Sequence, residues 1–279
     1  MINPVIVGKS SDLFFAQPIT FATMKIARQF AAGQVEVELL TTQYPEDRAL
    51  VPDDFKMAPD LERSVLEVAH FALQRKLPLV KDILDRLYET ATDAEYLIFT
   101  NNDIAVMPYF YTAVNALIDA GYDALVINRR IISDEYRALA EIPLMYAEAG
   151  RKHEGHDCFV FRREAYPQFK LGQICVGMPL IGRVMVWNLF CFGKKFEEFK
   201  KKHLTFHLGD PVMKWQKGGQ ADYVTHNKTE MYKVLQELQS AVAAAVVRQM
   251  LSKYPSEFDF GYGEMKQGGF ETLGDTAAK

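Results

Sequence analysis

One stretch of the chain constrains its fold more than any other: Tyr96-Leu-Ile-Phe-Thr-Asn-Asn-Asp103, an apolar strand that runs into a polar tip ending on an acid. A carboxylate at the carboxyl end of a buried strand in an α/β sheet lies where such folds bind ligands, and a divalent cation there can bridge it to phosphate. Asn-Asn-Asp is also favourable turn chemistry, so a simple turn is the structural alternative. The pattern predicts an α/β protein with a nucleotide or sugar-phosphate site at this strand end.

The composition is that of a folded protein without a general affinity for polyanions. Of the 279 residues 49% are apolar and 24% charged, which suits one α/β domain with a C-terminal appendage. The net charge of −4 provides no attraction to nucleic acid or to anionic membranes. No apolar run approaches the ~20 residues that span a bilayer. The cysteines are odd in number and widely spaced, as in a reducing compartment: Cys158, Cys175 and Cys191. We expect a soluble, cytoplasmic protein with no transmembrane segment and no nucleic-acid partner.

Hydrophobic periodicity predicts strands that alternate with helices. The predicted strands are 5–8, 35–40, 96–100, 123–128, 156–162 and 204–208. The predicted helices are 13–30, 59–75, 79–88, 109–120, 180–190 and 229–253. Such alternation implies a substantially parallel sheet that helices cover on both faces.

Two polar groups beyond the Asn-Asn-Asp tip are candidates for the same site. His207 lies in Phe206-His-Leu-Gly-Asp210, a strand closed by a glycine and an acid, and imidazole pairs readily with a carboxylate around a divalent transition ion. Asp157 follows His156 in another strand, where its carboxylate could act as a general base on a hydroxyl. The structural alternatives are a core histidine with a backbone partner and an aspartate that only caps its strand.

The N-terminal segment and one arginine pair are the remaining candidates. Val7-Gly-Lys-Ser10 resembles the end of a Walker A loop, but Asn3 stands where the first glycine should be, so a strand-to-helix turn is the better interpretation. Val7, Gly8 and Lys9 still qualify as ligand-binding residues, because the end of the first strand commonly touches the ligand in nucleotide-binding α/β folds. Arg129-Arg130 could bind a diphosphate through bidentate hydrogen bonds, or lie at the surface.

The order of these motifs resembles the nucleotide-diphospho-sugar transferases of the GT-A fold. The motifs that carry the resemblance are Asn-Asn-Asp at 101–103, Gly-His-Asp-Cys-Phe-Val-Phe-Arg-Arg at 155–163, Val-Gly-Met-Pro at 176–179 and Leu-Thr-Phe-His-Leu-Gly-Asp at 204–210. The resemblance covers about residues 1–235 and implies a GT-A-like domain there. It implies a Rossmann-type α/β/α sandwich with a mostly parallel mixed central sheet, and transfer of a sugar from a nucleoside diphosphate sugar to an unknown hydroxyl acceptor.

The resemblance also implies roles for individual residues. In that family an Asp-x-Asp motif holds a divalent metal and the donor diphosphate, a later acid often serves as acceptor base, and a histidine near the C-terminal end can complete the metal shell. Asn101, Asn102 and Asp103 would then bind the donor, Asp103 and His207 would ligate Mn²⁺ or Mg²⁺, and Asp157 would be the base. Asn101 stands where the first acid should be, which removes one negative charge from the metal site.

Two other functions remain open at this point. A non-catalytic nucleotide-sugar-binding relative is the stronger alternative, because Asn101 weakens the metal site. A sugar-phosphate nucleotidyltransferase shares the fold but carries a glycine-rich, arginine-containing loop that Gly8-Lys-Ser-Ser lacks. Beyond the domain we expect a C-terminal helix at 229–253, packed on its own domain or paired with a second copy in a homodimer, and a flexible tail at 254–279.

Overall fold

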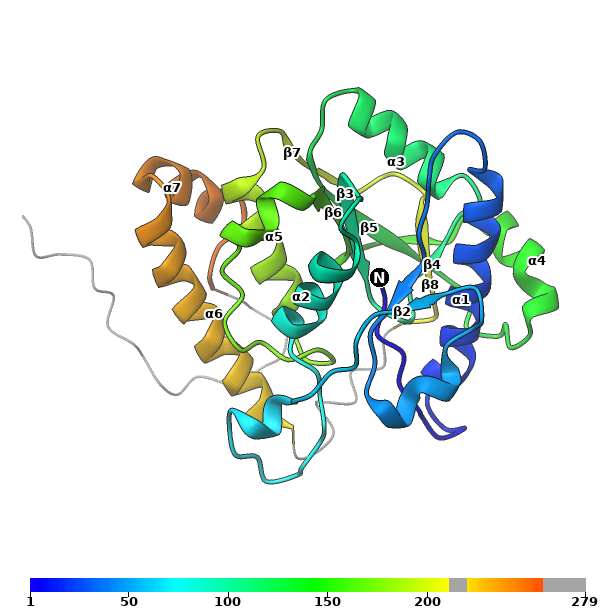
Figure 1. The fold of residues 1–279 in the computed structure, drawn as a ribbon, viewed down its shortest axis with the longest axis horizontal. Helices are drawn as coiled ribbons and strands as arrows, with labels where there is room; N and C mark the ends of the chain where they lie inside the picture. The colour runs from blue at the N-terminus through cyan, green and yellow to red at the C-terminus, as the bar shows by residue number, and fades with distance from the viewer. Residues whose placement is uncertain (211–219, 258–279) are drawn as a thin grey trace, which may run out of the picture.

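A mixed sheet lies at the centre of the computed structural model, which describes residues 1–210 and 220–257 (Figure 1). Within those residues six strands pair in the order β3-β6-β5-β8-β4, and β7 pairs with the first half of β5. The strands are β3 (Tyr96–Thr100), β4 (Ala105–Val106), β5 (Ala124–Ile132), β6 (Arg151–Arg162), β7 (Phe196–Phe199) and β8 (Thr205–Leu208). A smaller parallel pair joins β1 (Leu40–Thr41) to β2 (Lys56–Met57).

The pairing directions correct one part of the predicted fold. The α/β class and the mixed sheet are confirmed, but the described central sheet is not mostly parallel: β6 is antiparallel to both β3 and β5, β4 is antiparallel to β8, and only β7 and β8 run parallel to β5. For β5 and β6 the reason is that the chain, after an excursion beyond the end of β5, turns back and pairs with the same strand, which requires no crossover to a parallel position. Because β3, β5 and β8 run in one direction, their carboxyl ends meet at the same edge of the sheet.

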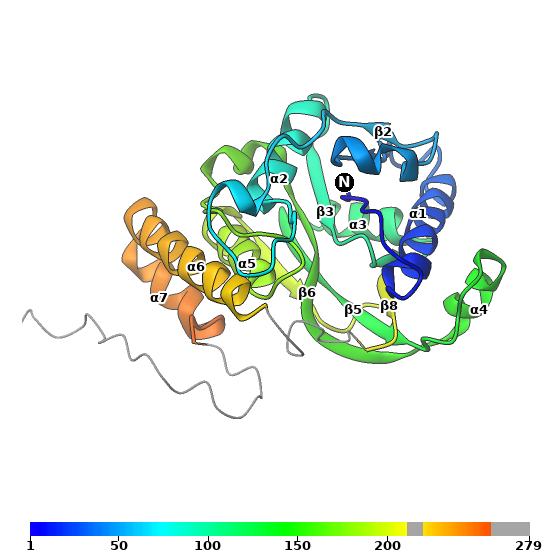
Figure 2. The same ribbon diagram turned by 90° about the horizontal axis from the view of Figure 1, so that it is seen from below.

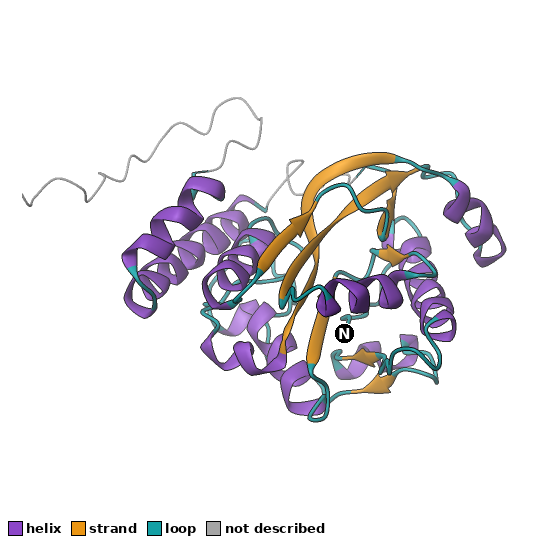
Figure 3. Ribbon diagram, turned by 90° about the horizontal axis from the view of Figure 1, so that it is seen from above, coloured by secondary structure: helices purple, strands orange, loops and turns teal. Residues whose placement is uncertain are grey.

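Helices cover both faces of the sheet and give the predicted three layers (Figures 2 and 3). Alternate residues of β3 point to opposite faces, as in any strand. Leu97 and Phe99 pack with α2 (Val80–Thr90) and α5 (Ile181–Phe192), whereas Ile98 packs on the side of α1 (Leu13–Phe30) and α3 (Phe110–Asp119). The excursion between β5 and β6 carries the short α4 (Ile142–Ala147). The helices predicted at 13–30, 79–88, 109–120 and 180–190 are confirmed.

The predicted strand at 5–8 does not form, and most of 35–40 is irregular, with Leu40 alone belonging to a strand. Side chains take the place of a neighbouring strand in the first segment. The backbone N–H of Val5 donates to Gln17 Oε1 at 2.9 Å, and that of Ile6 donates to Asp47 Oδ1 at 2.7 Å. The segment is therefore held beside α1 rather than in the central sheet.

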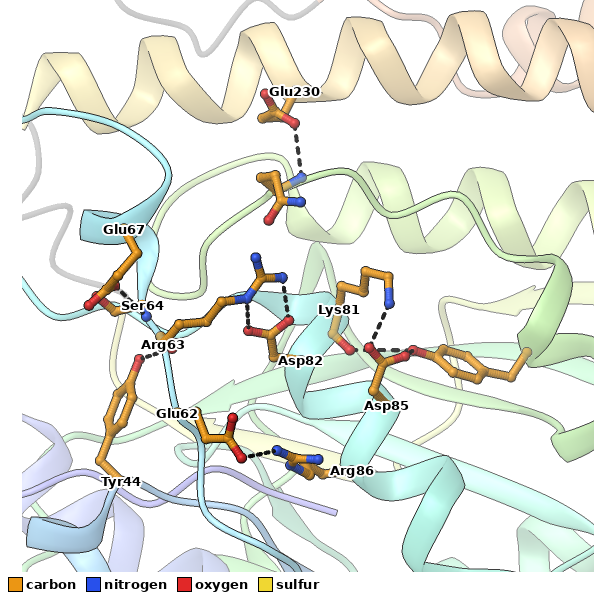
Figure 4. A network of polar contacts seen from close by, with 12 residues as sticks. Tyr44, Glu62, Arg63, Ser64, Glu67, Lys81, Asp82, Asp85, Arg86 and Glu230 are labelled. Carbon is orange, nitrogen blue, oxygen red and sulfur yellow. Dashed lines mark hydrogen bonds and ion pairs between the residues drawn. The ribbon is translucent and has the colours of Figure 1, made fainter.

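The helix predicted at 59–75 is also absent, and only a 3-10 turn at Val65–Glu67 forms there. Tertiary contacts of this segment, drawn in Figure 4, prevent the helix that the periodicity predicts. Arg63 donates two hydrogen bonds of 2.8 Å to Asp82 on α2, and its carbonyl accepts from the Tyr44 hydroxyl at 3.0 Å. These contacts hold the segment in an irregular conformation beside α2.

The predicted C-terminal helix is two helices, α6 (Ala221–Ala241) and α7 (Ala244–Lys253), separated by the extended Val242. The break lets both helices pack against α5, because their buried residues join the core that α5 enters. Tyr254, the first residue of the predicted tail, is buried, and its carbonyl accepts from Trp187 Nε1 at 2.9 Å. The rest of that tail, from 258 on, lies outside the described residues. Among the described helices none has the length and apolar character needed to span a bilayer.

Candidate functional site

Five titratable side chains meet where the carboxyl ends of β3, β5 and β8 lie together. Charges within the group shift the pKa values of its carboxyl and imidazole side chains, and the five include four residues that the sequence predicts for the site. We call this group the polar cluster: Asp103 from the turn after β3, Arg129 from β5, His153 and Asp157 from β6, and His207 from β8. The Thr100 hydroxyl ties β3 to β6 beside it by donating to the Asp157 carbonyl at 2.9 Å.

Asp103 and His207 form one half of the polar cluster. His207 Nε2 lies 3.3 Å from Asp103 Oδ2, and its Nδ1 lies 2.8 Å from the Gly209 carbonyl. The positive φ of Gly209, 68°, lets the chain fold back so that this carbonyl accepts from the ring. Burial alone would lower the pKa of His207, but the hydrogen bond and charge of Asp103 raise it. Burial likewise opposes ionisation of Asp103, yet His207 outweighs it and lowers the pKa of that carboxyl.

Arg129 and Asp157 form the other half, an ion pair between Nη1 and Oδ1. Both side chains are more than nine-tenths buried, with exposed fractions of 7% and 9%. Burial raises the pKa of Asp157, although the charge of Arg129 opposes that rise. Asp157 Oδ2 and Arg129 Nε have no hydrogen-bond partner within the described residues. The pair therefore keeps one free carboxylate oxygen of elevated basicity.

Two irregularities in β6 bring these groups together. Ile127 pairs with Cys158 and Asn128 with His156, so Asp157 is an extra residue in the strand. Arg130 then pairs with Lys152, so the three residues 153–155 lie opposite the single Arg129. Bulges of this kind turn side chains toward a common point and are frequent beside active sites. Here they place the carboxylate and an imidazole against one guanidinium.

A buried network behind the polar cluster holds the same strands. Glu198 on β7 accepts hydrogen bonds from Asn128 Nδ2 at 3.1 Å, His156 Nε2 at 3.0 Å and the Tyr254 hydroxyl at 3.0 Å. Asn128 and His156 precede Arg129 and Asp157 in the sequence. The network therefore fixes the backbone on which the ion pair is carried.

This network predicts an acid-sensitive contribution to stability. Burial alone would raise the pKa of Glu198, but its hydrogen bonds lower it from 4.5 to about 2. A carboxyl whose pKa is lowered by folding stabilises in full above its unfolded pKa, and that contribution is lost as the pH falls toward 2. In urea unfolding between about pH 5 and pH 2, we expect the wild type to lose about 3 kcal/mol more than Glu198→Gln. Equal losses in the two proteins would contradict this assignment.

Gln17 on α1 joins the Asn-Asn-Asp turn to the N-terminal segment. Its Oε1 accepts from Asn102 Nδ2 at 3.1 Å and from the Val5 backbone N–H at 2.9 Å, and the residue is 4% exposed. Asn102 is therefore fixed by α1. Asn101 and Asp103 lie in the same turn, partly buried, beside the polar cluster.

Replacing Gln17 with Met is expected to destabilise the fold by about 1–3 kcal/mol, because the Val5 N–H and the Asn102 amide lose their shared acceptor. Chemical unfolding measures this change directly. Gln29→Met is the matched control, since Gln29 is exposed on the same helix and should alter stability by less than about 0.5 kcal/mol. A Gln17→Met protein as stable as that control would remove Gln17 as the link.

The structure does not bring all the predicted residues into contact. Gly8 and Lys9 are exposed and Val7 is half-buried, and no hydrogen bond or ion pair joins them to the polar cluster within the described part of the chain. Their segment still lies near the site, because Val5 and Asn102 share Gln17. Their predicted contact with a ligand remains a prediction.

Two residues of the site, His153 and Gln17, were not predicted from the sequence. Gln17 is one of several polar residues in α1, and nothing in the local sequence distinguishes it. His153 is followed two positions later by Gly155, and a glycine inside a strand often marks a bulge. The glycine therefore indicates a bulge in β6 at the residues opposite Arg129.

Two side chains of the polar cluster, Asp103 and His207, have the chemistry of metal ligands. In residues 1–210 and 220–257 no group of three or more His, Cys, Asp or Glu side chains is arranged to hold a metal ion. Both are suitable ligands nevertheless, because Asp103 Oδ1 is buried with no hydrogen-bond partner among the described residues, and His207 turns Nδ1 to a carbonyl and Nε2 to the carboxylate. Metal-ligating histidines donate their other N–H in this way. Mg²⁺ is commonly bound by one or two protein groups together with substrate phosphates.

Comparison with known proteins identifies the fold. No protein-family profile and no curated protein sequence matches the chain. S. aureus TarS 1–349 in complex with UDP-GlcNAc has a similar structure, with a TM-score of 0.54 and 11% sequence identity over 91% of this chain and 70% of that chain. TarS 1–349 in complex with UDP gives a TM-score of 0.51, 8% identity and coverages of 91% and 69%. The chain thus shares the fold of these structures, the GT-A-like α/β fold that its motifs predict.

Proposed function

We propose that the protein is a glycosyltransferase that moves a sugar from a nucleoside diphosphate sugar to a hydroxyl acceptor. The observation that carries the proposal is the meeting of Asp103, Arg129, Asp157 and His207 at the carboxyl ends of three strands that run in one direction. In open α/β sheets that edge is where ligands bind. Similarity to structures solved with UDP-GlcNAc and UDP supports this class of donor.

The proposed roles follow from the chemistry of each group. Sugar transfer requires an acceptor hydroxyl that loses its proton and a diphosphate whose developing charge is neutralised. Asp157 is the base, because burial raises its pKa and leaves Oδ2 free to accept a proton. Arg129 and the turn at 101–103 bind the diphosphate, and residues 7–9 border the nucleotide.

Asp103 and His207 would hold a divalent cation, Mn²⁺ rather than Mg²⁺ because one ligand is a nitrogen. When bound, the ion would supply positive charge to the departing diphosphate. His207 Nε2 faces Asp103 Oδ2, and the hydrogen bond and charge of that carboxylate raise the pKa of the imidazole against the effect of burial. We also infer a cytoplasmic location from the odd number and wide spacing of Cys158, Cys175 and Cys191 in the sequence.

One observation favours a second candidate, a nucleotide-sugar-binding protein without transferase activity. Arg129 already engages Asp157 Oδ1, and Asn101 supplies no charge where the first acid of the motif should stand. A base that stays paired with a buried guanidinium is restrained from approaching a hydroxyl. The transferase and the binding protein would bind the same nucleotide sugar, and only the transferase would turn it over.

The test is thermal unfolding of the protein with UDP, ADP, GDP and UDP-GlcNAc, each with and without Mn²⁺. Ligands that bind the native state raise the melting temperature by mass action. We expect a Mn²⁺-dependent rise with one nucleoside diphosphate, and then release of that diphosphate from its sugar in a coupled assay. No rise with any of them contradicts the proposal, and a rise without turnover favours the binding protein.

A further inference from the structure

Two hydrogen-bond donors face each other in the polar cluster with no acceptor between them. His153 Nδ1 accepts the backbone N–H of Gly155 at 2.7 Å, so this nitrogen carries a lone pair. The proton of the neutral imidazole is then on Nε2. His153 Nε2 lies 3.5 Å from Arg129 Nη2, which is also a donor. The pair therefore lacks the group that would satisfy both N–H bonds.

The state of the ring follows from its surroundings. Burial and the charge of Arg129 lower the pKa of His153 to about 4, so the imidazole is neutral at physiological pH. Gly155 leaves room for the ring in this orientation, because a Cβ at that position would lie 2.6 Å from His153 Nδ1 and Cε1. Only glycine at 155 allows the ring to fold back onto its own strand.

Arg129 has unused hydrogen-bonding capacity at the same point. Its side chain is 7% exposed, Nη1 is paired with Asp157, and Nε is buried without a partner in the described residues. Such a buried donor costs free energy until an acceptor reaches it. His153 is only partly buried, so an incoming group has access from its side.

We propose that Arg129 and His153 form a two-donor subsite that binds a non-bridging oxygen of the donor diphosphate. The proposal rests on the proposed function and adds His153 to the donor-binding residues. A phosphate oxygen suits the position because it carries charge and accepts several hydrogen bonds at once, as bidentate recognition by arginine requires. Binding would convert two opposed donors into two charge-assisted hydrogen bonds to one oxyanion.

The experiment is isothermal titration of the full chain with UDP and with inorganic pyrophosphate. His153→Phe removes the Nε2–H donor, His153→Gln keeps an N–H donor near the same place, and His70→Phe is the control at an exposed histidine. We expect His153→Phe to weaken both ligands about tenfold, the size expected for one hydrogen bond to a charged group, and His153→Gln to recover most of that loss. His70→Phe should bind like the wild type.

The outcomes separate this inference from the proposed function. Tight UDP binding by the wild type with unchanged binding by His153→Phe overturns the subsite and leaves the proposed function standing. Wild-type protein that binds neither UDP nor pyrophosphate overturns both. Equal losses of ligand affinity in His153→Phe and His153→Gln would mean that His153 contributes only packing, and they also overturn the subsite. Should His153→Phe unfold, Gly155→Ala provides the second variant, because it displaces the ring and is expected to weaken UDP binding in the same direction.

Discussion

Replacing Asp157 with Asn is expected to lower the rate of sugar transfer by about 10²- to 10⁴-fold, the usual contribution of a positioned general base. The amide cannot take the acceptor proton, whereas the carboxylate has a pKa that burial raises and an Oδ2 with no hydrogen-bond partner among the described residues. Donor binding should change little, because the Asn carbonyl can still accept from Arg129 Nη1 where the carboxylate does now. Steady-state rates and donor affinity measured on the same preparation separate these two effects.

The matched control is Asp93→Asn, at an exposed carboxylate, which should leave rate and affinity unchanged. The unfolding midpoint of Asp157→Asn must also be measured, since the residue is buried in an ion pair. A folded Asp157→Asn protein that transfers sugar at the wild-type rate would eliminate Asp157 as the base. If donor affinity falls together with the rate, the role of Asp157 is instead to position Arg129 for donor binding.

Replacing Arg129 with Met is expected to destabilise the protein by about 3–5 kcal/mol, the range measured when one partner of a buried ion pair is removed. Asp157 would be left with an uncompensated charge, as its side chain is only 9% exposed. Its proton affinity should rise further in the variant, because the charge of Arg129 is what opposes the effect of burial. Chemical unfolding at pH 7 measures the loss of stability.

Two further variants make this prediction specific. The double variant Arg129→Met/Asp157→Asn removes both charges and should recover part of the stability that the single variant loses. Arg248→Met, at an exposed arginine of α7, should change stability by less than about 0.5 kcal/mol. A double variant no more stable than Arg129→Met would show that packing of the arginine stem, rather than its charge, accounts for the loss.

The elements that the sequence predicts well are those whose periodicity and packing agree. α1 has the predicted bounds of 13–30 because its apolar face is also its buried face. The segment at 59–75 has helical spacing too, but Arg63 binds Asp82 on α2 and the segment is irregular apart from one 3-10 turn. The local sequence pattern contains no information about such a contact, because the two residues belong to different elements.

The site divides in the same way. The sequence by itself determined which chemical groups lie in or just after the strands: Asp103 after β3, Arg129 in β5 and His207 in β8 follow from strand patterns and from the rule that α/β sheets bind ligands at their carboxyl edge. Only the tertiary structure decided that Asp157 pairs with Arg129 and that His153 faces the same guanidinium. The reason is register. Two bulges in β6 shift its pairing register against β5. The position of a bulge depends on the partner strand, and the local sequence of β6 contains no information about that partner.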